Sequence, residues 1–385
     1  MMKLFDPILP DSKLHKSFHE IRNNECYAKV KPIIQGWAEG LLERSGEARK
    51  FVTEFQSTFN SSMWEMYLNK ALSELGCSVD YSKSSPDFVV KTPNNYQFNI
   101  EAVISDQPAG GDEKEPFDHQ GFKDRGALKL VGKIRDKLKI FQGSDGKKHP
   151  YCSLAHVKDR PFVIAVAPFD NMRSLMQNNE LINLVLFGIG APVLEGTELR
   201  QDRIRSIATA SGAPVEMGIF TNDSYREISA VIFSTVGTFG KAVAESRIER
   251  LVRATRYRTI EKDRIPLGSP LWQLGVHRFQ VDKMNYLKTQ RWDFGSDIIG
   301  SDVHILHSSF HHESHLDGLH IYFNPYAEVP FEPDFAWPGE VSLNYYDVTT
   351  DKPIQIHPDG ALVSRQFFEL SPFWLHQLLT GYGFA

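Results

Sequence analysis

Apolar positions recur along this chain with two different periods. A helical period, with apolar residues three or four apart, predicts helices, whereas continuous apolar runs bounded by turn residues predict buried strands. Gly76 follows the first helical stretch and is expected to end it. The predicted helices cover 51–75, 124–141 and a segment near 173–188, and the predicted buried strands lie in 161–169 and 226–237.

Residues 85–105 predict a β-hairpin with an Asn-rich turn. Side chains alternate along a strand, so Phe98 and Ile100 are expected on one face and Glu101 on the other. If the turn is centred on Asn94, residue 87 stands opposite residue 101, and a register one residue shorter leaves them diagonal. The hairpin therefore brings two acids, Asp87 and Glu101, close together.

Two opposed carboxylates need a physical reason. At ~5 Å and an effective dielectric constant near 20 they repel each other by roughly 3 kcal/mol. An ordinary cross-strand pair contributes only about 0.2–1 kcal/mol, which does not offset that repulsion. A divalent cation would offset it, because Mg²⁺ binds oxygen ligands and is often held by one or two carboxylates.

The remaining pattern divides the chain into three parts. Residues 1–48 are expected to form a helical extension, and residues 49–245 the core. Residues 246–385 are expected to form a C-terminal extension or a small β-rich domain. That part opens with the basic stretch "ESRIERLVRATRYRTIEKDR", expected to be helical or linking, and later contains the strand-like pieces "LHIYFNPYA" and "EVSLNYYDV".

Composition is that of an ordinary globular protein, with 41% hydrophobic and 24% charged residues in 385. No apolar run reaches the ~18 residues of a membrane span, and the first residues lack the order of a signal peptide. The three cysteines, Cys26, Cys77 and Cys152, suggest reduced thiols and a cytoplasmic location. A net charge of −5 gives no overall nucleic-acid signature, so such binding would rest on local basic stretches.

The hairpin sequence "SPDFVV…NIEAV", preceded by "MWEMYLNKALSELG", resembles the PD-(D/E)xK nuclease superfamily. With "PFVIAV", "ISAVIFS" and the "GK" at 240–241, the chain is similar to a largely uncharacterised bacterial branch of it. The resemblance implies an α/β fold: a restriction-endonuclease-like αβββαβ core, with a mixed sheet flanked by helices. The C-terminal third matches nothing with an assignable function.

The resemblance also implies a metal site. An acid on the first core helix, the Asp of the Pro-Asp strand and the Glu of the next strand bind Mg²⁺ (or Mn²⁺) in that family, which here assigns Glu65, Asp87 and Glu101. The family's lysine normally comes two residues after the Glu, but position 103 is valine. In this superfamily the lysine can migrate to a neighbouring element, and Lys137 borders the apolar stripe of helix 124–141.

Each assignment has a structural alternative. Lys133 and Arg135 are further candidates for the migrated cation, and any lysine of this helix can be a solvated edge. Ser62 and Glu65 have the S-x-x-E spacing of a capping box. Asp87 can end a turn, and Glu101 can point to solvent. The six histidines of 304–320 suggest zinc ligands, although their spacing fits no standard zinc module and strand or surface histidines are the alternative.

The expected function is a Mg²⁺-dependent phosphodiester hydrolase: a nuclease for DNA rather than RNA and an endonuclease rather than an exonuclease. Its expected role is defence against foreign DNA, such as phage, or repair, with a possible homo-oligomer or defence-system partner. The basic segments "KDRGALKLVGKIRDKLK" and "RIERLVRATRYR" are candidates for backbone contacts. The alternative is a catalytically inactive nuclease-fold protein that binds nucleic acid or serves in assembly. A further possibility is that the C-terminal region carries the function.

Overall fold

A computed structural model describes the chain except for residues 1, 45, 106–118, 145, 147–148, 170–177, 196–197, 260–278, 281–284, 295–297 and 382–385. The Gly, Pro and acid content of residues 105–121 predicts a loop, and most of that segment lies outside the described residues. Among the helices that are described, none combines the length and apolar character required to cross a membrane.

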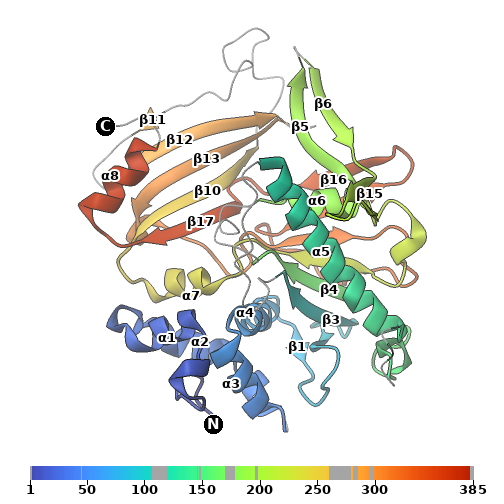
Figure 1. Ribbon diagram of the computed structural model, residues 1–385, viewed down its shortest axis with the longest axis horizontal. Coiled ribbons are helices and arrows are strands. Elements are labelled where there is room, and N and C mark those ends of the chain that lie inside the picture. Colours follow the sequence, from blue (N-terminus) through green and yellow to red (C-terminus); the bar gives the residue numbers. More distant parts are fainter. Residues whose placement is uncertain are drawn as a thin grey trace.

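The centre of the molecule is an eight-stranded mixed sheet in the order β1-β2-β3-β4-β9-β14-β15-β16 (Figure 1). β2 runs antiparallel to β3, whereas β3, β4 and β9 are parallel. β14 is antiparallel to β9 and parallel to β15. The strand bounds are Ser78–Val79 (β1), Phe88–Lys91 (β2), Gln97–Ile104 (β3), Phe162–Ala167 (β4), Ala230–Phe233 (β9), His320–Phe323 (β14), Ser342–Asp347 (β15) and Lys352–Ile356 (β16).

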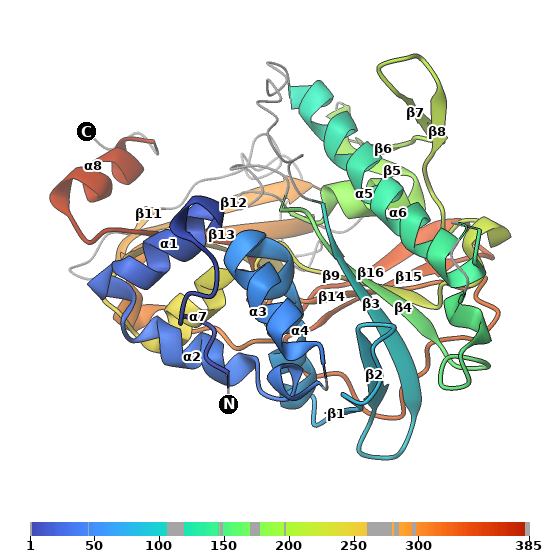
Figure 2. The same cartoon turned by 60° about the horizontal axis from the view of Figure 1, so that its bottom comes forward.

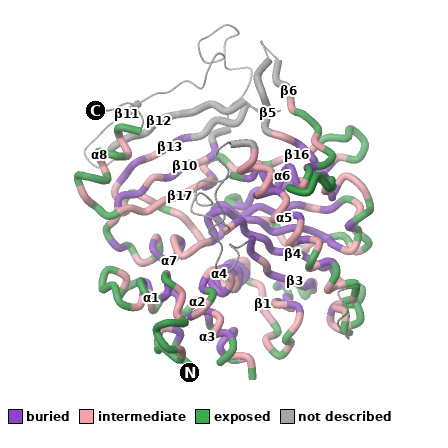
Figure 3. The backbone as a smooth tube through the Cα atoms, in the orientation of Figure 1, coloured by how far each residue is buried: buried purple, intermediate pink, exposed green. Residues whose placement is uncertain are grey.

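Helices cover both faces of this sheet (Figure 2). One face packs against α4, and the other against α5 and α6. Because both faces are covered, every residue of β4 and β9 is buried, which explains their continuous apolar sequences (Figure 3). The helix bounds are Lys16–Asn23 (α1), Val30–Trp37 (α2), Ala48–Ser57 (α3), Asn60–Glu74 (α4), His119–Gln142 (α5), Glu180–Phe187 (α6), Phe239–Ser246 (α7) and Pro372–Thr380 (α8).

A second sheet of five strands has the order β11-β12-β13-β10-β17. Its strands are Phe279–Gln280 (β11), Asn285–Phe294 (β12), Ile298–His307 (β13), Leu251–Thr259 (β10) and Leu362–Phe368 (β17). Two short hairpins complete the strands: Ile189–Glu195 (β5) with Glu198–Arg203 (β6), and Ser206–Ala208 (β7) with Pro214–Glu216 (β8).

The C-terminal part contributes to both sheets. In chain order, β10 is the first strand of the second sheet, where it lies between β13 and β17. The later strands β14, β15 and β16 extend the central sheet beyond β9. The strands β14, β15 and β16 therefore share one hydrogen-bonded sheet with the core. The N-terminal helices likewise pack into the core cluster that contains α4, through residues such as Phe18 and Trp37.

Most predicted elements are confirmed. The hairpin, the helix over 124–141 and the strands within 161–169 and 226–237 are present. The helix predicted over 51–75 is two helices, α3 and α4, because the chain breaks at Phe59, whose φ is 52°. α6 occupies the described part of the helix predicted near 173–188.

The prediction of a helix or linker after residue 245 is wrong for residues 251–259, which form β10. Leu251 and Val252 are both buried but belong to different apolar clusters, so this central strand is covered on both faces. Its several arginines hide that pattern in the sequence.

The chain-order run α4-β1-β2-β3-α5-β4 has the sequence αβββαβ. The mixed α/β architecture with a large mixed sheet flanked by helices is thus confirmed.

Candidate active site

The hairpin has the register that brings its two acids together. Phe88 pairs with Ile100, so Asp87, one residue before β2, faces Glu101. The Asp87 amide donates to Glu101 Oε2 at 3.4 Å, and the Ala102 amide donates to Asp87 Oδ2 at 2.7 Å. The predicted pairing of residues 87 and 101 is confirmed.

Glu101 is buried and has two side-chain donors. Its side chain faces the side of the sheet covered by α5, where only 3% of the residue is exposed. Lys137 Nζ, from α5, donates to Glu101 Oε1 at 2.6 Å, and the Tyr151 hydroxyl donates to the same oxygen at 3.4 Å. Of the three cations considered on this helix, Lys137 is the one that contacts the acid, although its catalytic role stays a prediction.

Glu65 comes from α4, in the interior of the helix. α4 begins at Asn60 and Ser62 is buried within it, so the capping-box alternative is wrong. Glu65 is half-buried. Burial raises its pKa well above the usual value, and the next largest cause is the Asp87 carboxylate.

Burial raises the pKa of all three acids, and the Asp87 carboxylate adds to this effect for Glu65 and Glu101. Burial, followed by Asp87, raises the pKa of Glu101 to about 7, although Lys137 works against this. Burial also raises the pKa of Asp87, opposed by Lys137, the Ala102 amide and Arg44. The pKa of Lys137 is raised: burial lowers it, but Glu101 and Asp87 outweigh that effect. Burial therefore disfavours the charged forms of these acids, and a bound cation would favour those forms.

The residues suit Mg²⁺ or Mn²⁺ by donor type and by charge. All three acids offer carboxylate oxygens, the ligands that these hard cations prefer. Among the described residues, no three His, Cys, Asp or Glu side chains are already arranged around one ion position. The three acids therefore do not surround a single ion position, and Glu101 Oε1 accepts a hydrogen bond from Lys137.

The position of the family's usual lysine is occupied by Val103. This side chain packs against the apolar cluster that includes Ile164 and Val166. An amine therefore reaches Glu101 from α5 rather than from β3.

Two residues beside the acids were missed by sequence reasoning. Arg44 Nη2 donates to the Asp87 carbonyl oxygen, and Tyr151 contacts Glu101 as described above. No periodicity or motif connects either residue to the hairpin, because both contacts come from segments far away in sequence.

The histidines of 304–320 do not converge on one point. His311 Nε2 lies 3.3 Å from Glu313, His315 Nε2 lies 3.2 Å from Glu245, and His320 is buried in β14. Each described member thus has its own surroundings, and the structure gives the zinc interpretation no support.

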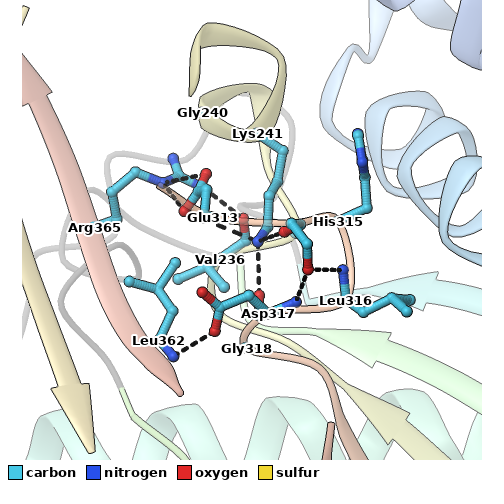
Figure 4. A network of polar contacts seen from close by, with 12 residues as sticks. Val236, Gly240, Lys241, Glu313, His315, Leu316, Asp317, Gly318, Leu362 and Arg365 are labelled. Carbon is cyan, nitrogen blue, oxygen red and sulfur yellow. Dashed lines mark hydrogen bonds and ion pairs between the residues drawn. The ribbon is translucent and has the colours of Figure 1, made fainter. Parts of the chain in front are cut away.

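The lysine of "GK" is also internal. Lys241 Nζ donates to the carbonyl oxygens of Ser314 and Asp317, both at 2.6 Å (Figure 4). The neighbouring Arg365 Nε donates to Glu313 at 3.1 Å, and all three charged side chains are at most 2% exposed. This network connects three parts of the chain: α7, the segment that follows β13, and the strand β17.

One of the two basic segments is partly engaged inside the protein. Arg256, on β10, bonds to Asp317 Oδ2 and to the Gly360 carbonyl, both at 2.7 Å. Arg253 Nη1 donates to Gln366 at 3.2 Å. These two arginines therefore hold the second sheet and its neighbours together.

None of the protein-family models, curated proteins or solved structures compared with this chain matches it.

Proposed function

We propose that the protein is a metal-dependent phosphodiester hydrolase, a nuclease that cleaves DNA by internal cuts. The observation that carries the proposal is the meeting of Asp87, Glu101 and Lys137 at one end of the hairpin, with Glu65 within electrostatic reach. Carboxylates whose pKa is raised by burial and by a neighbouring carboxylate, with one ammonium among them, are typical of functional sites.

The residues would divide the work as follows. Glu65, Asp87 and Glu101 would hold a divalent cation. When bound, that ion would activate a water molecule and neutralise charge on the leaving oxygen. Lys137 stays protonated beside the acids and would stabilise the extra negative charge of the phosphorus centre in the transition state.

The architecture is compatible with a restriction-endonuclease-like core. The run α4-β1-β2-β3-α5-β4 has the αβββαβ order of that fold, and α4 and α5 pack on opposite faces of the sheet. The resemblance noted for "SPDFVV…NIEAV" supports the same assignment. A role in defence against foreign DNA or in repair, and a cytoplasmic location, belong to this proposal by analogy alone.

The test is cleavage of plasmid DNA in Mg²⁺ or Mn²⁺ by the wild type, Asp87→Asn, Glu101→Gln and Lys137→Met. We expect each variant to lose about 10²-fold or more in rate, as when a preorganised charge is removed from an active site. Lys70→Met is the control, because Lys70 also lies on a core helix, α4, and also pairs with an acid, Glu74, but belongs to neither basic segment. Equal cleavage by all variants would mean a contaminating nuclease and would end the proposal.

One observation favours the second candidate, an inactive nuclease-fold protein that binds nucleic acid. The family's lysine position is filled by a partly buried valine, Val103, that packs against an apolar cluster. In that case the wild type would bind DNA without cutting it under any metal condition, and Lys137→Met would change neither result.

A further inference from the structure

The N-terminal segment reaches the candidate site through one side chain. Arg44, just after a short 3-10 helix, donates from Nη2 to the main-chain carbonyl oxygen of Asp87. Its guanidinium carbon lies 5.9 Å from the ring centre of Tyr81 and 5.8 Å from that of Phe88. The planar group is therefore held by two aromatic rings while it binds the carbonyl.

This placement is supported by a second set of contacts. The Tyr81 hydroxyl donates to Asn69 Oδ1 at 2.7 Å, and Asn69 Nδ2 donates to the carbonyl oxygens of Trp37 and Glu39, both at 2.9 Å. Asn69 lies on α4, the helix that carries Glu65, so the turn before Arg44 is tied to α4.

Gly40 makes that turn possible. Its φ is +80°, and a Cβ atom there would lie 2.2 Å from the Tyr81 ring. Only glycine accommodates both the backbone conformation and the ring. The Tyr81 ring, which packs against Arg44, can therefore take its position only because residue 40 has no side chain.

Such an anchor matters for Asp87, because its main chain lies outside the hydrogen-bonded ladder of the sheet. The paired register of β2 begins at Phe88, so Asp87 lies outside the regular ladder. Its amide makes only a long contact of 3.4 Å, and its carboxylate is held by the Ala102 amide. Arg44 supplies the donor for its carbonyl.

We propose that Arg44 is a positioning residue of the candidate site: it fixes the main chain at Asp87, and so the direction of that carboxylate, from outside the αβββαβ run. The inference rests on the proposed function for its catalytic meaning, but the anchoring itself is independent of any reaction.

Hydrogen–deuterium exchange of the metal-free protein tests the anchoring directly. We expect Arg44→Met to speed exchange of peptides covering 85–90 by roughly tenfold or more, because a hydrogen bond from a charged donor is lost, while other peptides keep their rates. Arg44→Lys retains the charge but not the planar fork and should give a smaller increase. Arg49→Met, an exposed arginine on the following helix, should leave these peptides unchanged.

Kinetics separates positioning from substrate contact. With a DNA substrate that the wild type cleaves, Arg44→Met should lower kcat by tenfold or more and change KM by less than about twofold. A rise in KM with kcat and the 85–90 exchange unchanged would overturn the proposal, because Arg44 would then contact the substrate. Unchanged exchange alone also overturns it. If no form of the protein cleaves DNA but exchange rises as expected, the anchoring stands and the nuclease proposal fails.

Discussion

Removing the negative charge of Glu101 should stabilise the metal-free protein at neutral and alkaline pH. The folded state raises the pKa of this carboxyl from 4.5 to about 7, chiefly through burial and Asp87. A shift of about 2.5 units corresponds to roughly 3 kcal/mol at 1.36 kcal/mol per unit. Because Glu101 is only 3% exposed, solvent screens little of this.

The sign follows from proton binding. Between about pH 4.5 and 7 the folded protein binds more protons at Glu101 than the unfolded chain does, so the free energy of unfolding falls as pH rises through this window. The contribution is fully present below the unfolded pKa and is lost above about pH 7. Glutamine resembles the protonated acid and does not titrate. Glu101→Gln should therefore match the wild type near pH 4.5 and exceed it by up to about 3 kcal/mol at pH 8.

The assay is urea unfolding with EDTA at pH 5, 6, 7 and 8, comparing the wild type with Glu101→Gln so that other titrating groups cancel. Glu249→Gln, at an exposed position, is the control and should show no pH-dependent difference. A loss of stability in Glu101→Gln at pH 8 would refute the reasoning, since Glu101 and Lys137 would then form a stabilising ion pair rather than a strained acidic site.

Three further outcomes are expected. Mn²⁺ or Mg²⁺ should raise the melting temperature of the wild type, and Asp87→Asn should abolish most of that increase, as followed by thermal unfolding with and without EDTA. Glu313→Gln should destabilise the protein by about 3–5 kcal/mol, because it leaves Lys241 and Arg365 buried without the negative charge of Glu313. Urea unfolding measures this loss, and an unchanged free energy of unfolding would mean that the network is energetically neutral. Lys50→Gln should weaken DNA binding, because Lys50 is exposed on α3, where it pairs with Glu47, and its charge also acts on Glu65. Fluorescence anisotropy should show the slope of log K against log salt reduced by about 1, and an unchanged slope would place the DNA elsewhere.

The sequence predicted those features that depend on local periodicity. Alternation along 97–104 fixed which side of the sheet Glu101 faces, and the turn position fixed its partner, Asp87. The helical wheel of 124–141 placed Lys137 at the edge of the apolar stripe, which is where an α5 side chain meets β3.

Other features depend on contacts that no local pattern records. Arg44 binds Asp87 from a segment that is distant in sequence. Its placement depends on Asn69, whose hydrogen-bond partners Tyr81 and Trp37 lie 12 and 32 residues away along the chain. β10 was missed because arginines occupy both of its faces, and their partners, such as Asp317 for Arg256, become apparent only in three dimensions. The extension of the central sheet by β14, β15 and β16 is likewise a non-local pairing.

The proposed function requires Asp87 and Glu101, assisted by Glu65, to bind one divalent cation. Anomalous diffraction from a crystal soaked in Mn²⁺ tests it most directly. We expect a manganese peak about 2.0–2.2 Å from oxygens of both Asp87 and Glu101, with Lys137 nearby. A strong manganese peak elsewhere, with these two carboxylates still bonded only to the Ala102 amide and Lys137, would contradict it.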